Sequence, residues 1–241
     1  MNVTQNETTP DSPPTTLPES PAAPSVRTWD RRLQQAVIIV GRLMLAYLFF
    51  SNLWWKLPPT FSCTNNFAFP TANAAGHPDG SKSNGLCYWI GVEAVYANQP
   101  RNLFVADMRY ANGPTLQVDI VPLAKLNGWV IETIIKPNIT WFGYLIFGAE
   151  ALIFITMFLG LFSRLGGLVA IGVSAQLMIG LANIPQPYEW EWGYNLMVML
   201  SLLMFGLAPG RYLGIDALLR PPLLRAAARG NILARLVSAL T

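Results

Sequence analysis

The segment Ile139–Leu159 constrains the fold of this chain more than any other. It is almost wholly apolar and long enough to cross the hydrocarbon core of a bilayer, which takes about 20 residues of helix. Its one charged residue, Glu150, stands near the middle. A carboxyl group at membrane depth costs about 2.5 to 3.5 kcal/mol on insertion scales, so we expect it to face a partner, a cavity or a functional site. The alternative is a structural hydrogen bond between packed helices.

The composition is that of a membrane protein. Hydrophobic residues make up 52% of the chain and charged residues 12%, and the mean hydropathy is positive. Four apolar runs approach spanning length and predict membrane helices over residues 36–55, 139–159, 165–183 and 193–208. We therefore predict an all-α membrane protein built as a four-transmembrane-helix bundle.

The basic residues predict how the bundle is oriented, because cytoplasmic flanks carry an excess of Lys and Arg. The link between the third and fourth runs contains only Glu189 and Glu191 as charged residues. The flanking arginines are Arg27, Arg31 and Arg32 before the first run, Arg164 between the second and third, and Arg211, Arg220, Arg225, Arg229 and Arg235 after the fourth. This distribution predicts a multi-pass protein of the inner (plasma) membrane, with both termini cytoplasmic and loop 56–138 extracytoplasmic.

Two segments flank the membrane domain, which we place at residues 29–220. Residues 1–28 are rich in Thr, Pro and Ser and predict a disordered cytoplasmic tail. Residues 221–241 predict an amphipathic cytoplasmic helix after a break at Pro221-Pro222, with arginines near an apolar stripe of Ile232, Leu236 and Leu240. Such a helix suits the anionic inner membrane surface. The net charge of +3 is thereby explained without a nucleic-acid partner.

The outer loop contains both cysteines of the chain, Cys63 and Cys87. Disulfides persist in extracytoplasmic compartments, so we predict a structural bridge between them. A catalytic thiol pair is the alternative, but a C-x-x-C spacing is absent. His77 and Asp79 lie between the cysteines, yet the spacing matches no zinc pattern, and no metal site is predicted.

The same loop contains two further patterns of secondary structure. Leu103–Tyr110 and Leu116–Ile120 alternate in character around the turn signal Asn112-Gly113 and predict a β-hairpin. Trp129–Ile135 has helical spacing and stops at Pro137, which predicts a short helix on the outer membrane surface. Together these elements would form a cap that covers a site or docks a soluble partner.

Aromatic residues gather at the predicted outer boundary, where they are expected to form an interfacial belt. They are Trp54, Trp55, Trp129, Trp141, Tyr188, Trp190, Trp192 and Tyr194. The alternative for the cluster over residues 185–191 is that one or two of its members line a ring-shaped ligand.

Helical depth predicts which polar residues meet in the bundle. At about 1.5 Å of rise per residue, Glu150 and Gln176 both lie roughly 15 Å from the inner boundary, so they could hydrogen-bond. Gly172, Gln176 and Gly180 are spaced by four and share a helix face that a neighbour can approach closely.

A polar stripe on the first run adds possible partners for Glu150. Arg42 starts about 9 Å from the inner boundary and either snorkels inward or, as we favour, pairs with Glu150. Arg42, Phe49 and Lys56 repeat every seven residues, and Asn52 lies close to that stripe.

Segments around these residues resemble the DoxX and DoxD-like membrane proteins, named after the membrane part of an archaeal thiosulfate:quinone oxidoreductase. The resembling segments are Gly41-Arg42-Leu43 through Asn52 and Trp55-Lys56-Leu57, then Ala149-Glu150 with Leu159-Gly160-Leu161-Phe162-Ser163-Arg164, and finally Ala208-Pro209-Gly210-Arg211-Tyr212-Leu213-Gly214-Ile215-Asp216. Their order, their spacing relative to the apolar runs and their side of the membrane all match the family.

The resemblance implies a membrane subunit of a quinone-linked oxidoreductase, with thiosulfate as a candidate reductant. Glu150 would relay protons to the quinone while Arg42 favours its charged form, and Gln176, Asn52 and Lys56 would contribute to substrate binding. Lys56 and Asn52 would attract an oxyanion at the outer mouth. The quinone would be a substrate, and we expect no bound haem, flavin or metal.

Besides the bilayer, the partner would be a small soluble redox subunit on the extracytoplasmic side or a larger membrane complex. The main alternative function is a non-catalytic subunit that anchors or assembles a redox, respiratory or photosynthetic complex. In that case Glu150, Arg42 and Gln176 would only fix helix packing. A transporter is a third possibility, but four spans without broken helices offer little for alternating access.

Overall fold

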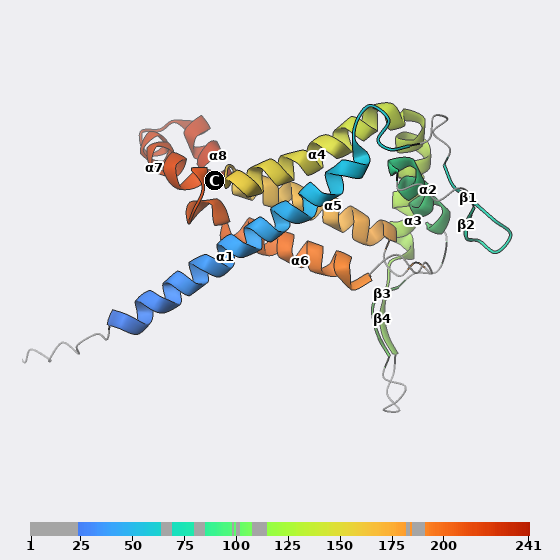
Figure 1. Ribbon diagram of the computed structural model, residues 1–241, viewed down its shortest axis with the longest axis horizontal. Helices are drawn as coiled ribbons and strands as arrows, with labels where there is room; N and C mark the ends of the chain where they lie inside the picture. The colour runs from blue at the N-terminus through green and yellow to red at the C-terminus, as the bar shows by residue number, and fades with distance from the viewer. Residues whose placement is uncertain are drawn as a thin grey trace, which may run out of the picture.

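The structure is a computed structural model that describes residues 24–63, 69–79, 85–97, 99, 102–107, 115–181, 184 and 191–241. Long helices form a bundle, with a cap at one end and two shorter helices at the other (Figure 1). The tail before residue 24, the Asn112-Gly113 turn and the aromatic cluster up to residue 190 lie outside the described residues, so the predictions for them stay predictions.

Four long helices form the bundle. They are α1 (Pro24–Leu53), α4 (Ile139–Leu159), α5 (Ser163–Leu181) and α6 (Glu191–Leu207). Helix α1 packs against α4 and α6, and α5 packs against the same two helices, so the four close into a ring. Helix α4 has the predicted bounds, α5 and α6 are shifted by up to two residues, and α1 begins well before the predicted apolar run.

Three of the described helical stretches are long and apolar enough to cross a membrane: Thr28–Lys56, Val121–Leu159 and Ser163–Leu181. Shorter apolar helices cover Leu86–Tyr96 and Gly193–Leu207. Large apolar side chains are exposed on the outside of the bundle, including Met44, Phe158 and Leu202. Exposure of this kind is unfavourable in water but suits contact with lipid.

The bundle interior is apolar and closely packed. Leu45, Phe49, Ile153, Met157 and Met204 are buried at its centre. Glycines bring the helices together there, as small residues do in membrane bundles. A Cβ on Gly167 would lie 2.8 Å from the Cα of Phe205, so α5 and α6 meet almost backbone to backbone.

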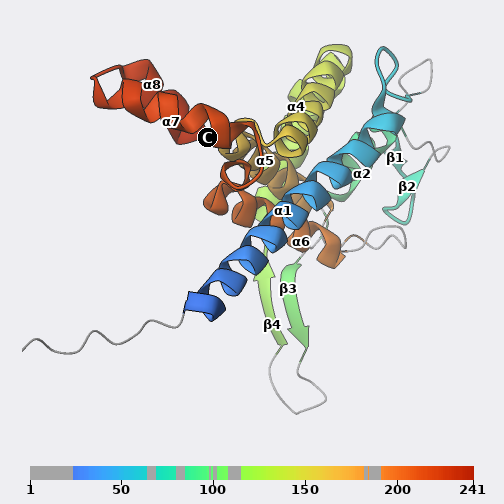
Figure 2. The ribbon, with the colours of Figure 1, turned by 60° about the vertical axis from the view of Figure 1, so that its left-hand side comes forward.

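The cap follows α1 through a single 3-10 turn, η1 (Trp54–Lys56). It contains helix α2 (Leu86–Tyr96) and a two-residue ladder of β1 (Thr71–Ala72) with β2 (Pro78–Asp79). Strands β3 (Asn102–Asp107) and β4 (Thr115–Asp119) form the predicted antiparallel hairpin, with Leu103 opposite Val118. This ribbon projects away from the helices of the cap (Figure 2).

The short surface helix predicted over residues 129–135 is longer than expected, and the prediction that it ends at Pro137 is wrong. Helix α3 begins at Val121 and runs to Val130, wider helical turns continue over Ile131–Ile135, and a 3-10 turn at Lys136–Asn138 leads directly into α4. Proline lacks an N–H but has a helical φ, so it is tolerated in the first turn of a new helical segment. The helical path therefore continues through Pro137 into α4.

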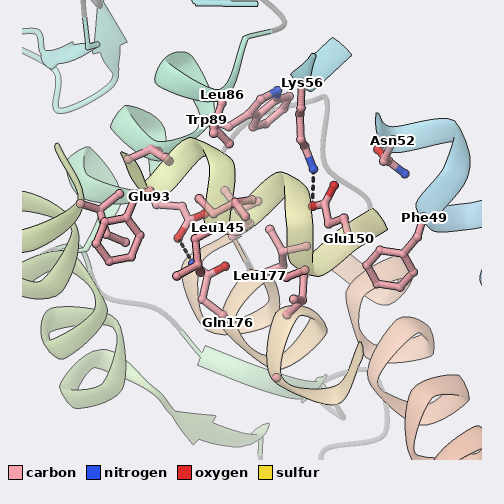
Figure 3. Close-up of a pocket in the computed structure, with 18 of the residues that line it drawn as sticks. Phe49, Asn52, Lys56, Leu86, Trp89, Glu93, Leu145, Glu150, Gln176 and Leu177 are labelled. Atoms are coloured by element: carbon pink, nitrogen blue, oxygen red, sulfur yellow. Dashed lines mark hydrogen bonds and ion pairs between the residues drawn. The ribbon is translucent and has the colours of Figure 1, made fainter. Parts of the chain in front are cut away.

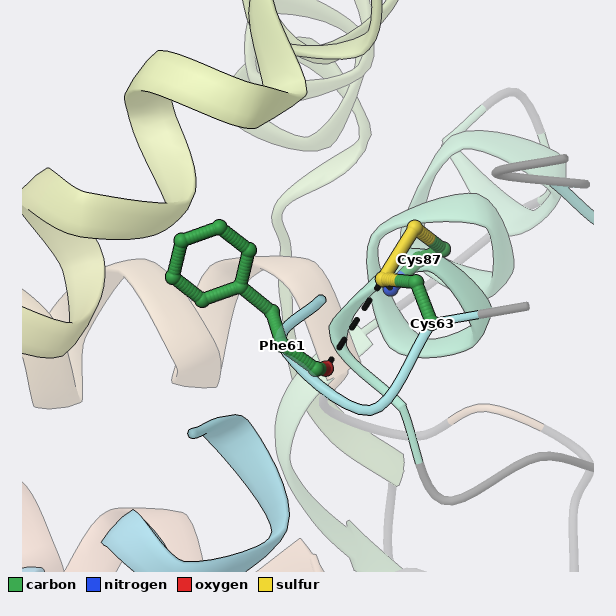
Figure 4. Close-up of a disulfide and its surroundings, with 3 residues drawn as sticks. All are labelled: Phe61, Cys63 and Cys87. Atoms are coloured by element: carbon green, nitrogen blue, oxygen red, sulfur yellow. Dashed lines mark hydrogen bonds between the residues drawn. A yellow bond between two sulfur atoms is a disulfide. The ribbon is translucent and has the colours of Figure 1, made fainter. Parts of the chain in front are cut away.

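The predicted disulfide is confirmed, because Cys63 and Cys87 are bonded with their Cα atoms 5.4 Å apart (Figure 4). It joins the chain leaving α1 to the first turn of α2. Two residues before Cys63, the ring of Phe61 packs on α4, where a Cβ on Gly143 would lie 2.4 Å from Phe61 Cε2. Phe61 also makes an edge-to-face contact with Tyr144 at 5.1 Å between centroids. The disulfide thus belongs to a segment that is anchored on the bundle.

The opposite end of the molecule contains helices α7 (Ile215–Ala228) and α8 (Ile232–Leu240). The predicted break at Pro221-Pro222 is wrong, because both prolines lie inside α7 and the chain turns at Arg229–Asn231. The two rings remove N–H donors but leave the backbone on a helical path. Ile232 and Leu236 are exposed on α8, as a helix lying on a membrane surface requires, and that location stays a prediction.

Asp216 fixes α7 to the start of α5. Its side chain is fully buried and accepts hydrogen bonds from the backbone N–H groups of Phe162, at 2.7 Å, and Ser163, at 2.9 Å. Its own N–H donates to Gly160 O at 2.8 Å. A carboxylate in this position satisfies amide groups that the helix itself leaves unpaired and interacts favourably with the helix dipole.

We predict that Asp216→Ala lowers the free energy of unfolding by about 2 kcal/mol, because buried N–H groups lose a charged acceptor. Thermal unfolding of the purified protein in detergent, followed by intrinsic fluorescence, measures the change. Asp30→Ala, on an exposed part of α1, is the matched control and should leave the melting temperature unchanged. Equal melting temperatures for the two variants would show that the Asp216 bonds do not stabilise the fold.

Candidate functional site

A cavity of about 560 Å³ lies between the cap and the bundle (Figure 3). Helices α1, α4, α5 and α6 supply its walls, and α2 and the turns after α3 contribute from the cap. Its lining is mostly apolar or aromatic and includes Phe49, Trp55, Leu86, Trp89, Phe142, Leu145, Leu177 and Tyr194. Four polar or charged side chains reach it from the bundle and η1: Asn52, Lys56, Glu150 and Gln176. Size and lining are those of a site for a small organic ligand.

Lys56 and Glu150 form a buried ion pair on one side of this cavity, with Lys56 Nζ donating to Glu150 Oε1. Lys56 is 6% exposed and Glu150 2%. The ammonium group also lies 4.3 Å from the centroid of the Trp55 ring, a favourable cation–π arrangement. Since each charge is costly to bury alone, the pair fixes the end of α1 against the middle of α4.

The second carboxylate oxygen of Glu150, Oε2, is buried and has no hydrogen-bond partner among the described residues. A buried oxygen left unpaired costs about 1 to 3 kcal/mol. Several other buried atoms in the described part of the chain share this state, such as Arg42 Nε. Glu150 is the member of that group that lines the cavity. A ligand there could donate a hydrogen bond to this oxygen, or accept one from it when Glu150 is protonated.

A second polar cluster lies on the other side of the cavity (Figure 3). Gln176 of α5 donates from Nε2 to Glu93 Oε2 at 2.7 Å, and Asn127 of α3 donates from Nδ2 to the same oxygen at 2.9 Å. Glu93 belongs to α2 and is 4% exposed. Gly180 makes room for it, because a Cβ there would lie 2.1 Å from Glu93 Oε2.

The family model described as "TQO small subunit DoxD" matches residues 117–236. The chain belongs to the DoxD family. The match begins in β4 and continues into α8, so it includes Glu150, Gln176 and Asn127. Lys56, Glu93 and the disulfide precede it. No curated protein and no solved structure matches the chain.

Family membership and the apolar helices together make this DoxD-family chain a multi-pass membrane protein. The resemblance seen in the sequence is thereby confirmed. The matched family is described as a small subunit.

Two predicted contacts of Glu150 are wrong in this DoxD-family protein. Gln176 bonds to Glu93 and not to Glu150, and the ion-pair partner of Glu150 is Lys56 and not Arg42. Depth along a helix does not specify rotation about its axis, and a lysine stem can extend several ångströms along the membrane normal.

Arg42 lies toward the other end of the bundle and does not line the cavity. Its Nη1 donates to Leu213 O, and a Cβ on Gly160 would lie 2.3 Å from that nitrogen. Together with Asp216, Arg42 therefore holds the segment after α6 against the α4–α5 turn. The prediction that Arg42 acts beside Glu150 has no support in this geometry.

Asn52 and Lys56 were expected to attract an oxyanion at the outer mouth, but both side chains line the cavity and already have partners. Asn52 Nδ2 donates to Leu48 O at 2.8 Å, and its Oδ1 accepts from Trp55 Nε1 at 3.3 Å, so both amide groups have partners within α1 and η1. Lys56 is buried inside the cavity, not at an outer mouth. An anion would therefore meet it only by entering the cavity.

Sequence reasoning missed Glu93, although a signal for it was present. Glu93 is the only charged residue in the apolar segment Leu86–Tyr96, just as Glu150 is in Ile139–Leu159. The segment is too short to span a bilayer, which is why a search for spans passes over it.

Gly180 and Gly172 provide a matched test of how the cap docks. Gly180→Ala would place a methyl group on the Glu93 carboxylate, so we predict a loss of about 1 to 3 kcal/mol in stability. Nothing lies within 4 Å of a Cβ on Gly172, so Gly172→Ala should keep or raise stability through helix propensity. Apparent melting temperatures in detergent measure both changes. If Gly180→Ala unfolds at the same temperature as Gly172→Ala, the close approach of α2 to α5 is refuted.

The ion pair yields a double-mutant prediction. Lys56→Met and Glu150→Leu should each lower stability by about 3 kcal/mol because each leaves one buried charge uncompensated. The double variant should recover most of that loss, since an apolar pair replaces an ionic one. Thermal unfolding of all four proteins gives the coupling energy. A double variant that loses the sum of the two single changes would contradict the pairing.

Proposed function

We propose that this chain is the membrane subunit of a quinone-linked oxidoreductase and that the cavity beside Glu150 is its quinone site. The observation that carries the proposal is the buried Oε2 of Glu150, which has no partner among the described residues and belongs to a side chain lining an apolar cavity. A quinone has a flat apolar ring with oxygens at its edge. Rings of this kind suit a cavity of about 560 Å³ with aromatic walls.

The residues around Glu150 support a role in proton transfer. Reduction of a quinone to a quinol adds two electrons and two protons, and negative charge develops on the ring oxygens. Lys56, beside Glu150, would stabilise that charge electrostatically in a site of low polarity. Glu150, when protonated at Oε2, would donate a proton to the oxygen.

The electrons would come from a reductant on the cap side, and thiosulfate is the candidate that the family suggests. Either a soluble redox subunit or a larger membrane complex would deliver them. The description of the matched family as a small subunit supports a multi-subunit setting, and the cap with its disulfide is the part that such a partner would meet.

The proposed topology has four spans, α1, α4, α5 and α6, with both termini cytoplasmic in the inner (plasma) membrane. The start of α1 and helices α7 and α8 lie at one end of the bundle (Figure 1). These segments contain most of the flanking arginines, as a cytoplasmic face requires. The disulfide lies at the opposite end, which suits the oxidising side of the membrane.

The test is thiosulfate-dependent reduction of a short-chain ubiquinone analogue by the tagged protein purified in nanodiscs together with its native partner subunits, followed by quinone absorbance. We predict that Glu150→Gln lowers kcat about 100-fold or more, because general acid–base catalysis contributes at least that much. Thr156→Val is the matched control, since Thr156 is buried on the same helix but bonds to Leu152 O and does not line the cavity. It should keep wild-type turnover.

Two outcomes would contradict the proposal. Equal turnover in Glu150→Gln and wild type would remove Glu150 from the reaction. Absence of activity in the wild-type assembly, with its partner subunits present, would favour a non-catalytic anchoring subunit. In that case the Lys56–Glu150 and Glu93–Gln176 contacts would serve only to hold the cap on the bundle.

A further inference from the structure

The Gln176 amide is oriented by its neighbours. A carboxylate accepts hydrogen bonds, so the amide atom that lies 2.7 Å from Glu93 Oε2 is the nitrogen. Asn127 binds the same oxygen at 2.9 Å and keeps the carboxylate in place. An amide nitrogen carries two hydrogens, and the bond to Glu93 uses one of them. Because Gln176 lines the cavity, its second hydrogen can be donated to a ligand there.

We propose that Gln176, oriented by Glu93 and Asn127, is a second binding group for the quinone, at the ring oxygen opposite the one at Glu150. One ring oxygen would accept a hydrogen bond from Lys56, or from Glu150 when Oε2 is protonated, and the opposite oxygen would accept one from Gln176. This inference rests on the proposed function and adds the residues that orient the ring. Gln176 contacts the ligand, whereas Glu93 and Asn127 act through it as positioning residues.

The placement of the two clusters carries this assignment. Figure 3 shows the Lys56–Glu150 pair and the Glu93–Gln176 pair on separate sides of one cavity, with Leu145 and Leu177 also facing it. Glu93, Lys56, Glu150 and Gln176 all line this cavity. A ring with oxygens on opposite sides can reach both clusters, and its apolar body would lie against the leucines. A 1,2-quinone has both oxygens on one side and could reach only one cluster.

Binding without turnover tests the assignment on the full-length protein in nanodiscs. Isothermal titration calorimetry compares three bicyclic ligands of similar size: 1,4-naphthoquinone, 1,2-naphthoquinone and 1-tetralone, which has a single carbonyl. We expect wild type to bind 1,4-naphthoquinone roughly tenfold more tightly than either of the others, the contribution of one well-oriented hydrogen bond.

Variants locate that preference in the structure. Gln176→Leu should reduce the affinity for 1,4-naphthoquinone to that for 1-tetralone and leave 1-tetralone binding unchanged. Glu93→Gln should reduce the preference partly, because an amide partner can either donate or accept and no longer fixes the orientation of Gln176. Ser174→Ala is the control: Ser174 is on the same helix, is buried against Ser201 and does not line the cavity. It should keep the full preference.

The failures of the two proposals are distinguishable. If wild type binds none of the three ligands, the quinone site and the second binding group are both overturned. If it binds all three equally, or if folded Gln176→Leu keeps the preference, the quinone site stands and the role of Gln176 is refuted. The wild-type comparison needs no variant, so a folding defect in Gln176→Leu does not prevent the test.

Discussion

The buried ion pair between Lys56 and Glu150 determines how the rest of the site is arranged. Neither charge is stable alone in apolar surroundings, so the end of α1 must meet the middle of α4. That meeting occurs where the bundle opens toward the cap, and it places a cation and a carboxylate at the edge of the cavity. The pair uses Oε1 of Glu150 and leaves Oε2 for a ligand. One oxygen of this carboxylate therefore holds the ion pair, and the other would be available to the proposed ligand.

The cap depends on a second buried carboxylate. Glu93 is carried by α2 and reaches Gln176 of α5 across the glycine at position 180. The Cys63–Cys87 bond keeps the first turn of α2 beside the segment that leaves α1, and Phe61 packs that segment onto α4. The cavity is consequently built by cap and bundle together, and reagents that loosen the cap would also alter the site.

Helix positions could be predicted from the sequence more closely than side-chain partners. The bounds of α4 agree because its apolar run lies between Asn138 and a Gly160 in the left-handed conformation. The hairpin could be predicted because residues alternate in character along its two strands. The disulfide could be predicted because both cysteines lie in a loop expected on the oxidising side of the membrane. The partners of Glu150 and Gln176 could not be predicted. The position of a residue along a helix gives its depth in the membrane, but it does not show which helices are neighbours or how far a lysine side chain extends. Helix α2 was missed because only runs of spanning length were considered.

A buried polar atom without a hydrogen-bond partner is weak evidence for a binding site unless it lies beside a cavity. Arg42 Nε and Glu150 Oε2 are both buried without a partner among the described residues. Arg42 lies in the closely packed end of the molecule, against Gly160 and Gly214, where a ligand has no room. Glu150 borders a cavity whose other side presents an oriented amide. Buried charges inside the bundle thus occupy two different surroundings. Arg42 holds the α7 end of the bundle, whereas Glu150 borders a cavity.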